Sequence, residues 1–401
     1  MKKKRIVSER AHLMCPNMFL GIMIKIDKEF HIQKFQESLS VIQAAHPIIS
    51  AVINMDQMDD IFYERRTDYQ IPYAIEKERN WEQIFQDISD KGWDVRKESL
   101  LKVSVFPKED FFQVLFVTHH ILCDGRGLLT LLEEFADYYV LDKKAVCVEE
   151  QLLESLEDLP SGSNLPFLSK YPVKSINKNW IKEKQAVSYH TYLEFEKKFA
   201  LQNPVNRKVR NIPKEELKEI AEKCRENAIS INDYLIAMMM IEEHANKVIM
   251  AADIRGKIRG YKQGSLGNYA TAYSVTISKP EKDLITLAKQ IRSKVCRIQT
   301  HPSEEMLVLA CYFAMEPTLI DAVAISSLGN FQSKAGKFAG DKMFGYALRN
   351  GHSVTNLGKI ESDSITEGFF IPPASPATIK TWGVLTINGN MKIAESFYPN
   401  K

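Results

Sequence analysis

The sequence lacks the features that would assign it at once to a disulfide-rich, zinc-binding or nucleic-acid-binding class. Its cysteines form no C-x-x-C pair, so we expect reduced thiols and neither a disulfide framework nor a zinc site. The formal net charge is only +2, which gives no overall basic field, so no nucleic acid is expected as a partner. The six cysteines are Cys15, Cys123, Cys147, Cys224, Cys296 and Cys311.

Long apolar runs are also missing. No stretch approaches the roughly 18 apolar residues that a membrane-spanning helix needs. The start, MKKKRIVSERAHLMCPNMFLGIMIKI, has a basic head, but the polar SERAH interrupts it and no small-residue cleavage site follows. We therefore expect an N-terminal strand, no signal peptide, no membrane span and a cytoplasmic location.

The composition and length do support a large folded core. Hydrophobic residues make up 45% and charged residues 26% of the 401 positions, as in ordinary globular proteins, and this length favours two domains. Residues 157–180 contain three prolines and many small polar residues without sustained periodicity, which is typical of a linker. We place an N-terminal lobe at 1–160, the linker at 161–180 and a C-terminal lobe at 181–401.

Both halves mix helical and strand patterns, and neither contains a short repeat. In the first half, apolar spacing predicts a helix at 31–45, paired strands at 100–106 and 111–120, and a helix from Leu128 to Tyr139. In the second half the predicted elements are a strand at 188–196, a helix near 214–226, a capping box at Ser230 and Asp233 before an apolar helix, a strand at 247–255, helices near 282–299 and 303–315, and C-terminal strands with a turn at Asn388-Gly389.

The stretch FFQVLFVTHHILCDGRGLLTLLEEF, residues 111–135, places two histidines where the predicted strand ends. Successive strand side chains point to opposite faces, so His119 and His120 cannot both reach one site. This geometry weakens a metal site formed by the two histidines with Asp124. One histidine acting as a general base suits proton removal near neutral pH, and a nucleophilic Cys123–His120 pair is the alternative.

The Asp-Gly pair that follows has two possible roles. Asp124 could orient a histidine, or it could fix the loop by accepting backbone N–H bonds or by pairing with an arginine. Gly125 suits a position where a side chain would clash or where φ is positive.

The segment HHILCDG matches the HHxxxDG motif of the chloramphenicol acetyltransferase-like superfamily, which includes condensation domains of nonribosomal peptide synthetases and alcohol acetyltransferases. The resemblance extends over residues 10–400. It includes AAHPII at the end of the first helix, SINDYLIA, ADIRG, SLGNYATAYSV and SVTNLGKI at 353–360. The similar ISSLGN at 325–330 leaves open a placement of the last segment one strand earlier.

The resemblance implies an α/β fold of the α+β type, with two similar lobes of mixed sheets and helices forming a V around a central tunnel. It implies that His120 is the catalytic base and that His119 is its inward-facing neighbour. It also implies that Asp124 pairs with Arg255 to hold the catalytic loop, with Gly125 in a supporting role. No metal is implied.

The implied activity is transfer of an acyl group from a thioester to a small-molecule alcohol or amine, without a covalent acyl-enzyme. No tightly bound cofactor is expected. Acyl-CoA is the favoured donor, and an acyl-phosphopantetheine on a carrier protein is the alternative. The basic run of Arg255, Lys257, Arg259 and Lys262 could meet donor phosphates or be a solvated loop. Lys257, Arg259, Asn268 and Asn356 are the predicted tunnel or donor-binding residues.

Some positions depart from the family pattern. The chain has no DFGWG element, which separates it from the plant branch, and Gly127 stands where a serine is common. No carrier-protein or adenylation region accompanies the motifs, so a free-standing enzyme is favoured over a synthetase module. A non-catalytic carrier-binding relative and a metal-dependent hydrolase are the rival hypotheses.

Overall fold

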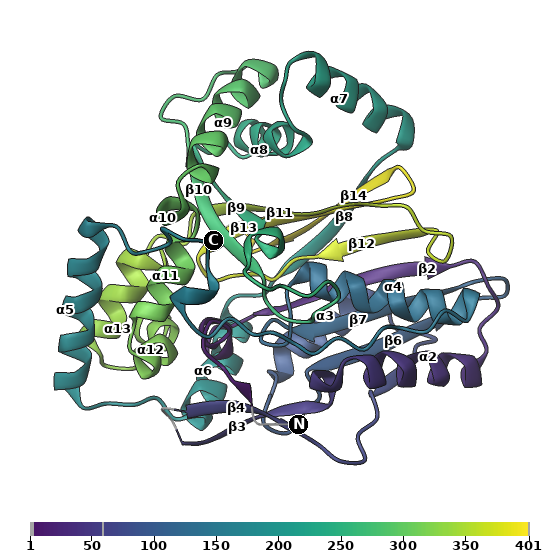
Figure 1. The fold of residues 1–401 in the computed structure, drawn as a ribbon, viewed down its shortest axis with the longest axis horizontal. Coiled ribbons are helices and arrows are strands. Elements are labelled where there is room, and N and C mark those ends of the chain that lie inside the picture. Colours follow the sequence, from purple (N-terminus) through teal and green to yellow (C-terminus); the bar gives the residue numbers. More distant parts are fainter. Residues whose placement is uncertain (1–3, 58–59, 400–401) are drawn as a thin grey trace.

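The computed structural model describes residues 4–57 and 60–399; the outermost residues of both predicted lobes lie outside this range. Two large sheets organise the chain, one of five strands in the order β12-β2-β7-β6-β5 and one of six in the order β10-β9-β11-β13-β14-β8 (Figure 1). Both are mixed, because β5 pairs with β6 and β11 pairs with β9 and β13 in parallel, whereas the other pairs are antiparallel. The predicted α/β class, with mixed sheets and helices, is confirmed.

The five-stranded sheet builds most of the N-terminal lobe. The helix predicted at 31–45 is α2, and its predicted apolar face of Phe35, Leu39 and Ile42 is buried. The elements of this lobe are β1 (Lys4–Arg5), α1 (Arg10–Leu13), β2 (Phe19–Ile26), α2 (Ile32–Ala45), a 3₁₀ turn (Pro47–Ser50), β3 (Ala51–Gln57), β4 (Asp60–Arg65), β5 (Tyr73–Ile75), α3 (Trp81–Lys91), β6 (Leu101–Pro107), β7 (Phe112–His119) and α4 (Gly125–Leu141). Strands β1, β4 and β3 form a separate small sheet.

The six-stranded sheet carries α7, α8 and α9 on its side away from the other sheet (Figure 1). Ser230 and Asp233 form the predicted capping box of α8, and Asn388 and Gly389 make the predicted turn with φ of 51° and 84°. The elements are β8 (Asn206–Ile212), α7 (Lys214–Glu226), α8 (Ile231–Glu242), β9 (Lys247–Asp253), a 3₁₀ turn (Arg255–Lys257), β10 (Ala270–Thr276), α9 (Leu284–Gln299), β11 (Gly351–Ile360), β13 (Thr378–Ile387) and β14 (Asn390–Phe397).

Two segments between the lobes differ from prediction. Most of the predicted linker is helix α5 (Phe167–Glu183), which buries Val173, Ile176 and Trp180 at helical spacing despite its internal proline. The predicted strand at 188–196 is wrong, because α6 (Tyr189–Gln202) occupies it. Ser188 caps α6 by accepting a bond from the Thr191 N–H, and the alternating pattern at 188–196 conceals a buried 3–4 spacing. A 3₁₀ turn (Leu156–Asp158) precedes both helices.

The C-terminal part of the chain returns to the N-terminal lobe twice. Strand β12 (Glu367–Ile371) pairs with β2, opposing Phe370 to Ile22, and so becomes the edge of the five-stranded sheet. The helices after α9 were predicted only as far as residue 315. They are α10 (Pro302–Glu305), α11 (Leu307–Ala314), α12 (Pro317–Leu328), α13 (Lys334–Phe338) and a π-helical turn (Ala339–Met343). Leu319 and Val323 of α12 join the core that contains β2 and β7. The boundary predicted at 161–180 therefore does not divide the chain into two separate cores.

Two further findings follow from the helices. ISSLGN at 325–330 lies at the end of α12, whereas SVTNLGKI lies on β11, so the alternative placement of that segment is wrong. Within residues 4–57 and 60–399 no single helix is long and apolar enough to cross a membrane. By length and composition alone, α11 and α12 would pass that test as a bent pair.

Candidate functional site

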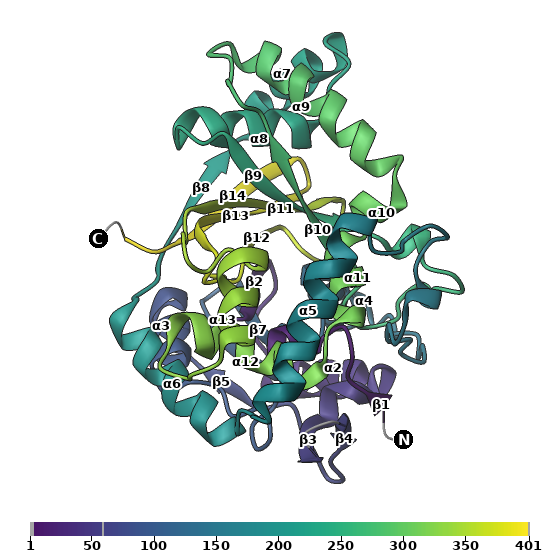
Figure 2. The same cartoon turned by 90° about the vertical axis from the view of Figure 1, so that its left-hand side faces the viewer.

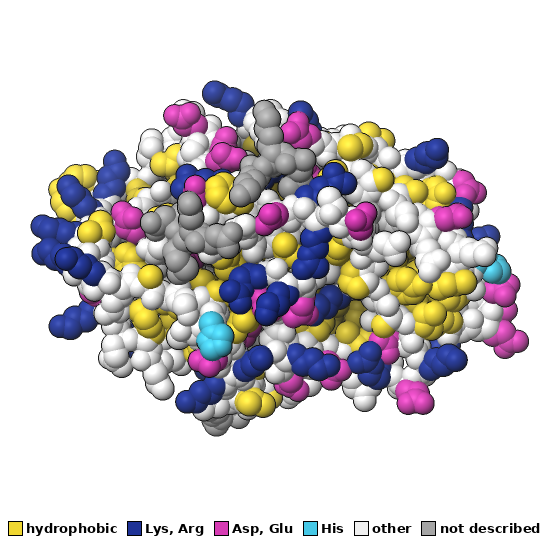
Figure 3. All heavy atoms as spheres, turned by 90° about the horizontal axis from the view of Figure 1, so that it is seen from below, with side chains coloured by type: hydrophobic (Ala, Val, Ile, Leu, Met, Phe, Trp, Pro, Cys, Tyr) yellow, Lys and Arg dark blue, Asp and Glu magenta, His cyan; other side chains and the backbone are white. Residues whose placement is uncertain are grey.

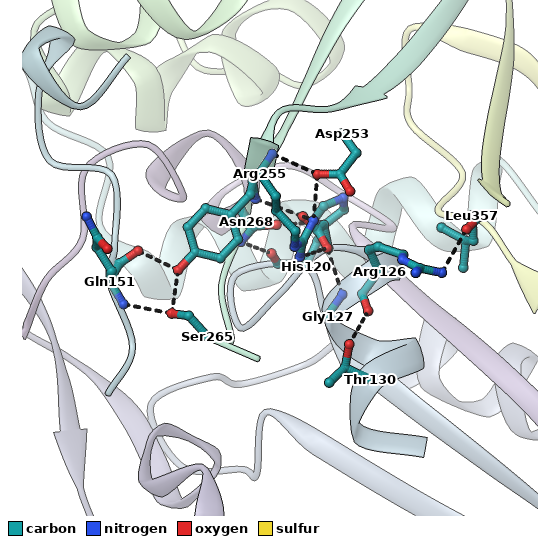
Figure 4. Close-up of polar contacts among 12 residues, drawn as sticks. His120, Arg126, Gly127, Thr130, Gln151, Asp253, Arg255, Ser265, Asn268 and Leu357 are labelled. Carbon is teal, nitrogen blue, oxygen red and sulfur yellow. Dashed lines mark hydrogen bonds and ion pairs between the residues drawn. The ribbon is translucent and has the colours of Figure 1, made fainter. Parts of the chain in front are cut away.

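The predicted histidine corner connects β7 to α4 at the junction of the two lobes. His119 is the last residue of β7, and Asp124 is the N-cap of α4, whose side chain accepts a bond from the Gly127 N–H at 2.8 Å. Asn268 and Arg255 reach this corner from the segment between β9 and β10 (Figure 4). The site therefore depends on contacts between the two halves of the sequence.

Asn268 fixes the orientation of His120. Its Nδ2 donates to the backbone carbonyl of His120 at 2.9 Å, so its Oδ1 is the atom that faces the ring, 2.9 Å from Nδ1 (Figure 4). Nδ1 must then carry the proton and donate, which leaves the lone pair on Nε2. Burial lowers the pKa of His120 below its ordinary 6.5, opposed only in part by backbone hydrogen bonding, Asp124 and Asn268. The ring is neutral at pH 7 and can accept a proton.

His119 points into the protein, as the family resemblance implied. The residue is 3% exposed, its Nδ1 accepts the Ile121 N–H at 3.2 Å, and its ring packs at 86° to that of Trp93 with centroids 5.7 Å apart. Burial, with smaller effects of His120 and Lys102, lowers the pKa of His119 to about 3. This histidine is a neutral packing residue.

His12 is a site residue that the sequence did not indicate. Its ring stacks on that of His120 with centroids 4.1 Å apart and an interplanar angle of 13°. Burial, followed by the neighbouring His120 and His119, lowers the pKa of His12 well below 6.5. The contact joins α1 to the end of β7, and no local pattern could have revealed it.

Asp124 is fully occupied in holding the loop. Its carboxylate accepts hydrogen bonds from Arg255 Nη2 at 2.8 Å and Nη1 at 3.0 Å. It also accepts hydrogen bonds from the backbone N–H groups of Gly127 and Tyr269 at 2.8 and 2.7 Å. Burial alone would raise the pKa of Asp124, but Arg255 and the two N–H groups outweigh it and hold the pKa below 3.8. The expected ion pair is present, and it joins the two halves of the chain.

The two glycines of the corner are required by close packing. A Cβ on Gly125 would lie 2.7 Å from Leu357 Cδ2, so the clash, and not a positive φ, explains this residue. A Cβ on Gly127 would lie 2.9 Å from Cys123 Cβ, so the serine common in the family does not fit here without movement. Cys123 is itself fully buried, which raises the pKa of its thiol and counts against the Cys123–His120 nucleophile.

The structure does not bring every predicted residue to His120. Lys257 is bound through Nζ to both oxygens of the buried Glu305 at 2.6 Å, whereas Arg259 and Lys262 are exposed and make no ion pair within the described residues. Asn356 donates to Asn232 Oδ1 at 2.7 Å and accepts from a neighbouring backbone N–H, so it joins β11 to α8. Among the described residues, none of these side chains forms a hydrogen bond or ion pair with His120, so only Asn268 of the predicted tunnel residues reaches the histidine.

A metal site is not formed by these residues. His119 and His120 diverge, and both oxygens of Asp124 are occupied by hydrogen bonds. Across residues 4–57 and 60–399, no group of three or more histidine, cysteine, aspartate or glutamate side chains is placed to hold an ion.

Two mixed sheets with their helices thus meet at the corner that the segment HHILCDG forms. The chain belongs to the condensation domain family, whose model matches residues 17–303, well over half of the sequence. Membership of this family indicates transferase activity. No curated protein sequence matches the chain significantly.

Solved structures with the same fold are related only distantly in sequence. TRI3 trichothecene 15-O-acetyltransferase from Fusarium sporotrichioides has a TM-score of 0.63 at 10% identity, covering 99% of this chain and 90% of its own. Polyketide synthase associated protein 5 from Mycobacterium tuberculosis has a TM-score of 0.62 at 13% identity, covering 100% and 95%. The epimerization domain of the third module of tyrocidine synthetase B has a TM-score of 0.56 at 14% identity, covering 97% and 87%. At these identities the likeness establishes the fold alone.

Proposed function

We propose that the protein transfers an acyl group from a thioester to the hydroxyl or amine of a small molecule, with His120 as the general base. The observation that carries this proposal is the orientation of His120. Asn268 occupies Nδ1, so the unprotonated Nε2 is left for the acceptor, on a ring that burial keeps neutral.

The step balances without a covalent intermediate on the enzyme. Nε2 of His120 takes the proton from the acceptor O–H or N–H while the acceptor lone pair forms a bond to the thioester carbonyl carbon. The C–S bond then breaks, and the proton held by His120 passes to the departing thiolate. A thioester is already reactive, so no serine or cysteine nucleophile is required.

The ion pair between Asp124 and Arg255 has a positioning role in this mechanism. It clamps the first turn of α4 against the segment before β10, from which Asn268 reaches His120. Loss of the pair would move His120 and Asn268 apart. In this mechanism Asp124 positions the loop and does not accept a proton from the substrate.

A diffusible acyl-CoA is the favoured donor in this proposal. The exposed Arg259 and Lys262 are free to meet nucleotide phosphates, whereas Lys257 is committed to Glu305. An acyl group on a carrier protein's phosphopantetheine arm is the alternative donor, because its thioester chemistry is the same. We further propose that donor and acceptor reach His120 along a path between the two lobes.

Thiol release tests the proposal directly. The purified protein is mixed with a panel of acyl-CoA and acyl-pantetheine esters and a panel of alcohols and amines, and free thiol and acylated product are both measured. We expect acceptor-dependent thiol release without a burst of acyl-enzyme, and its loss in His120→Ala. Equal product formation by wild type and His120→Ala would show that His120 is not the base. If turnover occurred only with an acyl carrier protein, that protein and not CoA would be the acyl donor.

A further inference from the structure

Helix α5 lies on the outside of the molecule, on the side that faces the viewer in Figure 2. It carries large apolar side chains that are exposed to solvent. Phe167, Leu168, Tyr171 and Ile181 are 68%, 83%, 62% and 61% exposed. The rings of Phe167 and Tyr171 pack together with centroids 5.0 Å apart. These residues do not serve the protein's own core, because the opposite side of the helix supplies Val173, Ile176 and Trp180 to it.

Lysines share this outer face. One helical face, with residues spaced 4–3–4–3 along the chain, contains Phe167, Tyr171, Lys174, Lys178 and Ile181. The exposed lysines of the helix and its C-terminal end are Lys170, Lys174, Lys178, Lys182 and Lys184, and none makes an ion pair within the described residues. Glu183, the acid of this helix, turns away and accepts the Ala335 N–H.

We propose that this outer face of α5 docks onto an anionic membrane surface. A helix that combines exposed aromatic and aliphatic side chains with lysines, and has no acid on the same face, suits the boundary between acyl chains and negatively charged headgroups. The helix is about 25 Å long at 1.5 Å per residue, so it can lie flat on the surface. Figure 3 shows cationic and hydrophobic side chains gathered at the left edge, the side on which Figure 1 places α5.

The choice of lysine favours a membrane over an acidic protein partner. Lysine is depleted in the cores of protein interfaces, where arginine is enriched, and no arginine lies on α5. Long lysine side chains can extend to headgroups while the apolar residues between them enter the boundary region. The inference does not depend on acyl transfer, since α5 contributes none of the residues that contact His120.

Vesicle sedimentation tests the proposal on the full chain. Vesicles of phosphatidylcholine alone are compared with vesicles that contain about one third phosphatidylglycerol. We expect binding to the anionic vesicles, weakened by salt because screening shortens from about 10 Å at 0.1 M to about 3 Å at 1 M. The triple variant K174E/K178E/K182E should bind about tenfold more weakly or worse. F167S/L168S/Y171S should also lose binding, through loss of apolar insertion.

A matched control uses three exposed lysines of α7, in K214E/K218E/K223E, which changes the net charge equally. This control should keep most of the vesicle binding, and His120→Ala should keep all of it. Equal loss in the α7 variant, or no preference for anionic vesicles, would overturn the docking site. Binding of an acidic acyl carrier protein through the α5 lysines, with no vesicle binding, would replace the membrane by that partner. Circular dichroism of each variant checks that the fold is retained.

Discussion

The two sides of the β7–α4 corner contain the same residue type in opposite environments. On the inner side, the ring of His119 packs against Trp93 and accepts a hydrogen bond from the backbone, so it contributes to the packing of the core. On the outer side, Asn268 engages Nδ1 of His120 and His12 covers a face of the ring, while the proposed function assigns Nε2 to a substrate. The neighbours of each ring, and not the residue type, therefore distinguish the proposed base from the packing residue.

Alanine substitutions at the two histidines should separate these roles most strongly. His120→Ala should lower kcat/KM by about 10² to 10⁴, the usual contribution of a general base, with little change in melting temperature. His119→Ala should instead lower the melting temperature, because it removes a buried ring from the core. Steady-state kinetics and thermal unfolding on both variants provide the check. Equal activity losses with unchanged melting would contradict the two-sided assignment.

The ion pair between Asp124 and Arg255 joins the two halves of the chain at this corner. Asp124→Asn or Arg255→Leu alone should cost about 3 to 5 kcal/mol of unfolding free energy, since each leaves a buried charge without its partner. The double variant should cost less than the sum. Denaturant unfolding of all four proteins measures the coupling, which should exceed the roughly 1 kcal/mol of an exposed pair. Additive effects would show that the bridge is energetically unimportant.

Asn268 is expected to act on the tautomer of His120. In Asn268→Leu nothing accepts the Nδ1 proton, so the ring populates both tautomers and kcat should fall about tenfold or more. KM for the acceptor should change less. Nitrogen NMR of the imidazole reports the tautomer directly, and a fixed Nδ1–H tautomer in the variant would remove this role from Asn268.

The corner could be predicted because its signals are local. An apolar strand run, two histidines and an Asp-Gly at a helix start occur within residues 111–135, and the capping box of α8 and the turn at Asn388 are equally short-range. The Asp124–Arg255 pair was expected only through the family resemblance, because residues far apart in sequence give no periodic signal. The family resemblance, and not the local sequence pattern, therefore predicted this ion pair.

The missed features were set by tertiary contacts. The prolines of the predicted linker concealed helix α5, which is stabilised by the packing of Val173, Ile176 and Trp180. The stacking of His12 on His120 depends on how α1 docks. Asn268 was predicted as a tunnel residue, but whether it faces a tunnel or His120 depends on the loop before β10.

His12 should influence the acid limb of the pH profile. As the proposed base, His120 would act in its neutral form. Burial lowers its pKa below 6.5, so activity should persist below pH 6.5 and fall only when the ring protonates. His12→Ala exposes the ring to water and should move the acid limb to higher pH, towards the ordinary value. His12→Phe keeps a stacked ring and should stay near wild type. Profiles of log(kcat/KM) that coincide for the two variants would argue against shielding by His12.

The smallest expected effect concerns the exposed cations beside the corner, which differ from Arg255 and Lys257 in having no carboxylate partner within the described residues. Charge reversal in R259E/K262E should raise KM for an acyl-CoA about three- to tenfold, because each exposed charge contributes about 1 kcal/mol or less. The same variant should leave KM for an acyl-pantetheine unchanged, since that donor has no nucleotide. The pair K218E/K223E on α7 changes net charge equally and should affect neither donor. If KM rose for both donors, the substitutions would act by altering the loop and not by removing contacts with the nucleotide. If KM rose for neither donor, Arg259 and Lys262 would not bind the CoA phosphates.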